Sequence, residues 1–364
     1  MAISTGGTSI LIIYTGGTIG MVEHPKSGAL TPFDFSYLFD KIPELKSLDC
    51  EIEVCELDQP IDSSSITPSD WVSIARLIKD SYETYDGFVV LHGTDTMSFS
   101  ASALSFMLRG LKKPVVFTGS QLPIGRLRTD GKENLLTAIE IAAAKREDGS
   151  PRVPEVTILF QDYLMRGNRT SKVSADKFRA FKSHNYPHLA FTGIDIRYND
   201  PIIHHDEADS LEVYLELDPN VAVLKIFPGI TEALVRSVLA TSGLKGIVLE
   251  TFGSGNAPQY DWFVDALAEA VKRGVIVVNV TQCSTGSVAM QRYETGRQLE
   301  RVGLVSGYDM TTEAAVTKLM CLLGQGLDTT TIRTLIQTPL RGEMTITSDA
   351  EDFLSWAMMD RIRN

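Results

Sequence analysis

A threonine beside two glycines is the first candidate for chemistry in this sequence. The segment reads Tyr14-Thr15-Gly16-Gly17-Thr18 and closes an apolar, β-branched run. Two glycines let the backbone turn sharply, and they leave N–H groups free to face a developing oxyanion. The Thr18 hydroxyl is a candidate nucleophile, although a weak one without a neighbouring base. A plain glycine turn after a strand explains the same residues.

The four residues TGGT occur twice near the start of the chain, at Thr5–Thr8 and at Thr15–Thr18. The two copies flank one predicted strand. Ligands of open α/β sheets lie beyond the carboxyl ends of strands. Position therefore favours Thr18 over Thr8, and we interpret the first copy as an N-terminal segment without a catalytic role.

A second glycine turn, His92-Gly93-Thr94-Asp95, follows an apolar run that ends at Leu91. Asp95 could hold the ammonium group of an amino acid by a charge-assisted hydrogen bond, or it could cap the next helix. His92 could act as a base only if its ring pointed into the site. Strand alternation places it on the face opposite to Leu91 and Gly93, so we interpret it as a structural histidine.

A serine-rich loop and one lysine complete the set of candidates. The loop reads Asp62-Ser63-Ser64-Ser65, and it is either a simple turn or a source of donors for a carboxylate ligand. Lys172 follows another predicted strand. A buried lysine can lose its proton and act as a base, whereas most lysines lie at the surface.

Several other kinds of site are disfavoured. His204 and His205 are adjacent, so their side chains point to different sides and lack partners at ligand spacing. The sequence has no GxSxG, Walker A, HExxH or GxGxxG motif. The cysteines form no CxxC pair, and we interpret them as reduced thiols of a cytosolic protein; they are Cys50, Cys55, Cys283 and Cys321. No metal or organic cofactor is expected.

Composition indicates an ordinary globular protein. The 364 residues are 43% hydrophobic and 22% charged, with a formal net charge of -12. No basic run appears, which argues against a nucleic-acid partner. The apolar stretch at Ile10–Tyr14 is too short for a signal peptide, and no run is long enough to span a membrane. We therefore expect a cytoplasmic protein with no membrane partner.

Short apolar runs alternate with amphipathic segments, which predicts an α/β fold with mainly parallel sheets flanked by helices. The predicted strands are Ser9–Tyr14, Glu51–Glu56, Gly87–Leu91, Pro114–Thr118, Glu155–Gln161, Val221–Ile226, Gly246–Leu249 and Val275–Val280. The predicted helices are Pro68–Tyr82, Thr96–Leu108, Glu133–Lys145, Thr231–Thr241, Tyr260–Arg273 and Thr312–Leu323.

The length exceeds what one core usually supports, so two domains are expected. A polar stretch with two prolines and several acids lies within residues 190–220. We predict an N-terminal α/β domain at 1–200, a linker at 201–220 and a smaller C-terminal α/β domain at 221–345. Residues 346–364 are expected to form a helix or tail without chemistry.

Taken together, in this order and spacing, the motifs resemble the bacterial-type asparaginase/glutaminase family, and in particular its cytosolic type I branch. The similarity covers about Ser9 to Glu343 and runs through TGGTIG, DSSS, LHGTDTM, TGSQLP, GNRTSK, GNAP and TQCSTG. One Gly-Thr turn is common, but two of them followed by TSK are specific. The resemblance implies a two-domain fold with a larger N-terminal domain, assembled as a homodimer or homotetramer.

The resemblance also implies roles for individual residues. Thr18 matches the primary nucleophile of the family. Its second threonine, its substrate-binding aspartate and its lysine match Thr94, Asp95 and Lys172. The loop that holds the amino acid moiety of the substrate matches Asp62, Ser63 and Ser64.

The implied reaction is hydrolysis of L-asparagine to aspartate and ammonia through a covalent acyl-threonine on Thr18. Backbone N–H groups near Gly17 and Thr94 would stabilise the oxyanion, and the Thr94–Lys172 pair would supply the proton for ammonia. One departure concerns activation of the nucleophile. Relatives carry a tyrosine on the loop after it, whereas the stretch Met21–Pro32 has none.

Ala29 stands about where that tyrosine would fall, and Tyr37 lies further along the chain. The residue that activates Thr18 is therefore open, and Lys172 acting through Thr94 gains weight. Thr94 is itself a rival nucleophile. The remaining alternatives are an enzyme of mixed glutaminase and asparaginase specificity, a tRNA-dependent amidotransferase subunit, and a non-catalytic amino-acid-binding module.

Overall fold

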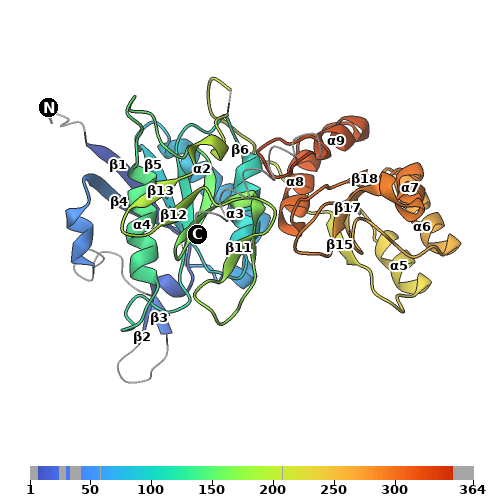
Figure 1. Ribbon diagram of the computed structural model, residues 1–364, viewed down its shortest axis with the longest axis horizontal. Helices are drawn as coiled ribbons and strands as arrows, with labels where there is room; N and C mark the ends of the chain where they lie inside the picture. Colours follow the sequence, from blue (N-terminus) through green and yellow to red (C-terminus); the bar gives the residue numbers. More distant parts are fainter. Residues whose placement is uncertain (1–6, 24–29, 33–41, 58, 207, 347–364) are drawn as a thin grey trace. The chain divides into compact units, whose positions relative to one another are not determined.

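The structure is a computed structural model that describes residues 7–23, 30–32, 42–57, 59–206 and 208–346 (Figure 1). The chain divides into two compact units. The first consists of Met1–Ser183 with His188–Leu215, and the second of His184–Pro187 with Glu216–Asn364. No helix in the described residues is long and apolar enough to cross a membrane.

The main sheet of the first unit has eight strands in its described part. Its parallel strands lie side by side in the order β8, β7, β5, β1 and β4, and antiparallel strands β9, β12 and β13 extend the sheet beyond β8. Their bounds are β1 Thr8–Tyr14, β4 Cys50–Glu56, β5 Gly87–Leu91, β7 Val115–Thr118, β8 Val156–Phe160, β9 Tyr163–Arg166, β12 Ala190–Thr192 and β13 Ile196–Tyr198.

The central strands are buried because both faces of the sheet are covered. Every residue of β5, β7 and β8 is buried. Helix α4 (Gly131–Ala143) packs on β7, β5 and β1, and α3 (Met97–Met107) packs on β8 and β7. Helix α2 (Pro68–Ser81) begins where the Asp70 carboxylate accepts the Thr67 N–H at 2.7 Å, with Pro68 in the first turn.

Short elements surround this sheet. Three two-stranded pairs are β2–β3, β6–β14 and β10–β11. Their strands are β2 Met21–Glu23, β3 Leu30–Pro32, β6 Leu108–Arg109, β14 Glu212–Val213, β10 Thr170–Lys172 and β11 Phe181–Ser183. The 3-10 turns are η1 Thr18–Gly20, η3 Pro43–Ser47, η4 Ser63–Ser65, η5 Gly167–Arg169 and η6 Asp200–Ile202.

The second unit has a parallel sheet in the order β15, β16, β17 and β18. The strands are β15 Val221–Lys225, β16 Gly246–Thr251, β17 Ile276–Thr281 and β18 Val305–Ser306. The helices are α5 Glu232–Leu239, α6 Asp261–Lys272, η7 Met290–Arg292, α7 Glu294–Arg301, α8 Thr312–Gly324 and α9 Thr329–Ile336. A buried cluster that includes Phe263, Leu249 and Val277 forms the core under α5 and α6.

The α/β class is confirmed, and each predicted strand and helix is present within about two residues of its predicted ends. The change of unit between Leu215 and Glu216 falls inside the predicted linker at 201–220, but residues 201–215 belong to the first unit. There η6 and β14 are ordered elements, and β14 pairs with β6. The polar composition of this stretch predicted a linker, but short ordered elements such as η6 and β14 can be equally polar. Residues 347–364, which include most of the predicted tail, lie outside the described residues.

Candidate active site

Two glycine turns meet at the carboxyl ends of the adjacent strands β1 and β5. Tyr14 and Leu91 are partners in the last pair of their register. The backbone N–H and the hydroxyl of Thr15 both donate to the Leu91 carbonyl, each at 3.0 Å. The turn is thereby fixed to β5, and it places the half-buried Thr18 at the start of η1.

Glycine is required in this turn by conformation and by space. Gly16 and Gly17 have φ values of 130° and 89°. A Cβ on Gly17 would lie 2.5 Å from the Cα of Gly93, and a Cβ on Gly16 would lie 2.2 Å from the Ile61 carbonyl oxygen. Real Cβ atoms do not approach that closely. The backbones of three loops therefore pack directly on one another around Thr18.

Lys172 contacts the second threonine. Its Nζ lies 2.8 Å from Oγ1 of Thr94 and 2.7 Å from Oδ1 of Asp95. The Lys172 side chain is 19% exposed, whereas that of Asp95 is 62% exposed. An amino group thus touches a hydroxyl and a carboxylate that follow β5 directly, although it is 78 residues from Thr94 in sequence. This is an arrangement that can move a proton.

The serine loop packs against the same turn. The Asp62 carboxylate accepts the Ser64 N–H at 3.0 Å, and its bonds to Ser64 hold the pKa of Asp62 below its ordinary value. The Thr96 hydroxyl donates to the Ser63 carbonyl at 2.7 Å. A Cβ on Gly93 would lie 2.5 Å from Ser63 Oγ. Ser63 is buried and Ser64 is exposed, so the loop has donors at the edge of the site.

His92 has a buried, fully bonded ring. Its Nδ1 lies 2.7 Å from the Gly93 carbonyl oxygen and its Nε2 lies 2.8 Å from Ser100 Oγ. Because the Gly93 carbonyl can only accept, Nδ1 carries the ring proton. Nε2 of the neutral ring then accepts from Ser100 Oγ, which itself accepts from Trp71 Nε1 at 2.8 Å. Burial lowers the pKa of His92 to about 4. The ring is neutral and positions the backbone of Gly93, which is the structural role the sequence indicated.

A third turn, after β7, brings Gln121 to the site, a residue that the sequence reasoning missed. The His92 N–H donates to the Thr118 carbonyl at 2.9 Å, which joins β7 to the second turn. Thr94 Oγ1 lies 3.4 Å from Gln121 Oε1. The Asp130 carboxylate accepts the Gln121 N–H at 3.0 and 3.1 Å. The rule that selected Thr18, a position directly after a buried parallel strand, would also have found Gln121.

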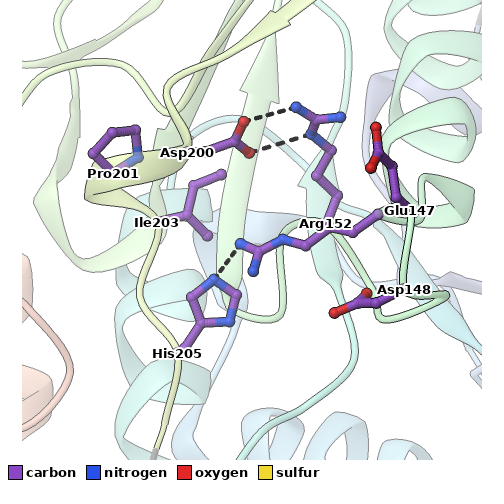
Figure 2. Close-up of a pocket in the computed structure, with 8 residues that line it drawn as sticks. Glu147, Asp148, Arg152, Asp200, Pro201, Ile203 and His205 are labelled. Atoms are coloured by element: carbon purple, nitrogen blue, oxygen red, sulfur yellow. Dashed lines mark hydrogen bonds and ion pairs between the residues drawn. The ribbon is translucent and has the colours of Figure 1, made fainter.

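A separate pocket of the first unit contains none of these residues (Figure 2). Arg152 binds Asp200 through Nε and a terminal nitrogen at 3.2 and 2.7 Å, and Arg146 bonds to Nε2 of His205. Both guanidinium groups are thus engaged by residues of the pocket itself. It has no hydroxyl beside a base, and we place no chemistry there.

Cys283, which belongs to the second unit, is a free, exposed thiol. Among the described residues, no group of three or more histidine, cysteine, aspartate or glutamate side chains could hold a metal ion. Thr8 is the first residue of β1, at the end of the strand opposite to Thr18. Thr5, Ala29 and Tyr37 lie outside the described residues.

The sequence of this chain matches two domain models of one protein family. The model named "Asparaginase, N-terminal" matches residues 9–204, and "Glutaminase/Asparaginase C-terminal domain" matches residues 220–336. L-asparaginase 1 of Escherichia coli is 45% identical over 339 residues, covering 93% of this chain and 98% of the relative.

Two further proteins show how broad this similarity is. A 60 kDa lysophospholipase of Mus musculus is 44% identical, with 93% of this chain and 62% of the relative covered. The crystal structure of L-asparaginase I from Vibrio cholerae superposes with a TM-score of 0.85 at 42% identity. The match covers 94% of this chain and all of that structure.

Proposed function

The chain belongs to the asparaginase family, and on that premise we propose that it hydrolyses L-asparagine to aspartate and ammonia through an acyl-threonine on Thr18. The observation that carries this proposal is the meeting of the two glycine turns, with Lys172 bonded to Thr94 at 2.8 Å. Two hydroxyls, free backbone N–H groups and one amine are the parts that acyl transfer from an amide needs.

The first step forms a bond between Thr18 Oγ and the side-chain amide carbon of the substrate. The hydroxyl proton of Thr18 passes to Thr94 while the hydroxyl proton of Thr94 passes to Lys172, which serves as the base. N–H groups near Gly17 and Thr94 stabilise the oxyanion, an effect worth roughly 10²–10³ in rate per donor. Lys172 then returns a proton through Thr94 to the leaving nitrogen, the C–N bond breaks and ammonia departs. A water molecule releases aspartate from Thr18.

The substrate's charged groups match the rim of the site. Asp95 is an exposed carboxylate and holds the α-amino group. The α-carboxylate binds at the loop of Asp62, Ser63 and Ser64. Asp62 is already engaged with the Ser64 N–H, so it shapes the loop while Ser63 and Ser64 provide donors. No metal or organic cofactor takes part in these steps.

The identity of the nucleophile is tested by trapping the intermediate. Purified protein is mixed with asparagine, quenched in acid and digested, and the peptides are analysed by mass spectrometry. We expect the aspartyl adduct on the peptide that contains Thr18, and none in Thr18→Val. An adduct on the Thr94 peptide of the wild type would make Thr94 the nucleophile and overturn the assignment.

The substrate is tested by comparing kcat/KM for asparagine and glutamine. The two amides differ by one methylene, which is worth about 1–3 kcal/mol in a pocket. We expect asparagine to be preferred, and comparable values would support the mixed glutaminase alternative. Binding of asparagine without ammonia release would support a non-catalytic module, and ammonia transfer to charged tRNA would support an amidotransferase subunit.

We further propose that the chain acts in the cytoplasm as a homodimer or homotetramer. The sequence resemblance to the type I branch supports this proposal. Sedimentation equilibrium across a range of protein concentrations measures the mass of the assembly. A monomer at every concentration that retains full activity would contradict it.

A further inference from the structure

The side chain of Gln121 connects the second threonine to the loop that follows the lysine. Its Oε1 lies 3.4 Å from Thr94 Oγ1, and its Nε2 donates to the Lys177 carbonyl at 3.0 Å. Lys177 lies between β10, which ends at Lys172, and β11. A carbonyl accepts only from the NH₂ end of the amide, so Oε1 must be the atom that faces Thr94.

The backbone of Gln121 is fixed as firmly as its side chain. Both oxygens of the Asp130 carboxylate accept the Gln121 N–H, and one of them also accepts the Leu122 N–H at 3.1 Å. Asp130 is 4% exposed and directly precedes α4. Asn134, in the first turns of α4, donates to the Gly119 carbonyl at 2.9 Å. The turn therefore presents Gln121 from a rigid base.

This arrangement determines where the Thr94 proton points. When Lys172 carries its proton it donates to Thr94 Oγ1, so the hydrogen of Thr94 needs another acceptor. Gln121 Oε1 is that acceptor. When Lys172 is neutral, Thr94 donates to Nζ instead and Oε1 loses its donor. The amide thus stabilises the state in which Lys172 holds the proton.

We propose that Gln121 is a positioning residue for the attack step, an inference that rests on the proposed function. As Thr18 attacks, its proton moves to Thr94 and the proton of Thr94 moves to Lys172. The hydroxyl of Thr94 then carries the proton that came from Thr18 and donates a hydrogen bond to Gln121 Oε1. Gln121 remains neutral throughout and exchanges no proton. It favours the charged product of the transfer and keeps that proton ready for the leaving nitrogen.

The test compares Gln121→Met with Gln121→Glu. Methionine has a similar length but no acceptor for Thr94, whereas glutamate keeps the acceptor and loses the NH₂ that binds Lys177. We expect kcat for ammonia release from asparagine to fall about tenfold in Q121M with KM within about twofold of the wild type. Q121E should recover most of that loss. The control is Gln325→Met, a half-buried glutamine at the end of α8, which should leave both constants unchanged.

Each outcome bears on the inference. A Q121M enzyme with wild-type kcat, or a Q121E enzyme as impaired as Q121M at an equal melting temperature, would overturn it. A change in KM alone would make Gln121 a substrate contact and overturn it as well. If Q121M does not fold, Gln121→Ala takes its place in the same comparison. A wild-type chain that releases no ammonia would remove the proposed function, and this inference with it.

Discussion

The contact between Lys172 and Thr94 determines which proton transfers the site can make. Nζ touches a hydroxyl on one side and the Asp95 carboxylate on the other. Lysine can act here as a fixed positive charge or as a group that gains and loses a proton. Arginine separates the two roles, because a guanidinium keeps its charge but does not deprotonate in proteins.

We predict that Lys172→Met and Lys172→Arg both lower kcat, by about 10²–10⁴, because positioned proton transfer is lost in each. Stopped-flow ammonia assays at saturating asparagine measure the effect. Lys132→Met is the matched control, since Lys132 forms an exposed ion pair with Glu44 at 2.6 Å. An arginine variant with near wild-type kcat would show that Lys172 contributes charge alone.

The buried ring of His92 makes the free energy of unfolding depend on pH. Its pKa is about 4 in the folded protein and about 6.5 when unfolded. Between these values the unfolded chain binds a proton that the folded chain does not, so stability falls as pH falls from about 6.5 to about 4. The contribution is about 3 kcal/mol at most. It is fully present above pH 6.5 and lost below pH 4.

Urea unfolding at several pH values measures this term as the difference between wild type and His92→Gln. Glutamine can bond to Ser100 but does not titrate, so the variant should lack the decline that His92 causes. The wild-type and variant curves should therefore converge as the pH is lowered from 6.5 to 4. Parallel curves across that range would mean that the ring is protonated in the folded state.

At the scale of elements, the turn after β1 depends on a close approach between backbones. Gly17 has a φ of 89°, and a Cβ there would meet Gly93 at 2.5 Å. Gly149 has a similar φ of 82°, but a Cβ there would have nothing within 4 Å. Alanine at either position would cost about 1–2 kcal/mol of stability, because its backbone would have to be left-handed. Only at Gly17 would its Cβ also clash with a neighbouring backbone.

We predict that Gly149→Ala lowers stability by about 1–2 kcal/mol and leaves kcat unchanged. Gly17→Ala should lose at least about 10² in kcat/KM, because the turn must move and displaces the oxyanion donors relative to Thr18. Thermal denaturation and steady-state kinetics on both variants make the comparison. Equal activity in the two variants would show that the approach of Gly17 to Gly93 does not matter for catalysis.

The elements that the sequence predicted well are those with a strong apolar pattern. Strands β1, β5 and β7 are continuous apolar runs because both faces of the sheet are buried. Some of the elements it missed lack that pattern. Helix α7 reads ETGRQLER and buries only Gly296 and Leu299, so it has no apolar stripe to detect. The pair β10–β11 has three residues in each strand, too short for a period to appear.

The candidate site was predictable to the extent that it depends on strand ends. Position selected Thr18 over Thr8, since Thr18 follows the strand, and the second glycine turn, which contains Thr94, also follows a buried parallel strand. Lys172 was not predictable in that way, because it reaches Thr94 from the short β10–β11 pair, 78 residues along the chain. Its role came from the family resemblance. Gln121 was overlooked because a glutamine before Leu-Pro looks like an ordinary turn residue.

At the scale of the whole molecule, the second unit contains a buried ion pair that the reaction does not use. Lys318, on α8, has its Nζ 2.5 Å from Oε1 of Glu343, and both side chains are fully buried. Lys318 also donates to the carbonyls of Ile336 and Thr338, at 3.0 and 2.7 Å. The pair therefore joins α8 to the end of α9 and to the segment that follows it.

We predict that Lys318→Met destabilises the second unit by about 3–5 kcal/mol, because it leaves the Glu343 carboxylate buried without its partner. Arg301→Met is the control. It removes a side chain that is 66% exposed and lies 2.9 Å from Glu294, which is 53% exposed, and an exposed pair is worth less than about 1 kcal/mol. Hydrogen exchange read by mass spectrometry should show faster exchange in α8 and α9 of K318M, while β1 and β5 of the first unit keep their protection.

Removing the carboxylate as well, in Lys318→Met with Glu343→Leu, should recover part of the lost stability. Equal acceleration in both units would mean that the chain unfolds as one cooperative body and that the pair stabilises all of it.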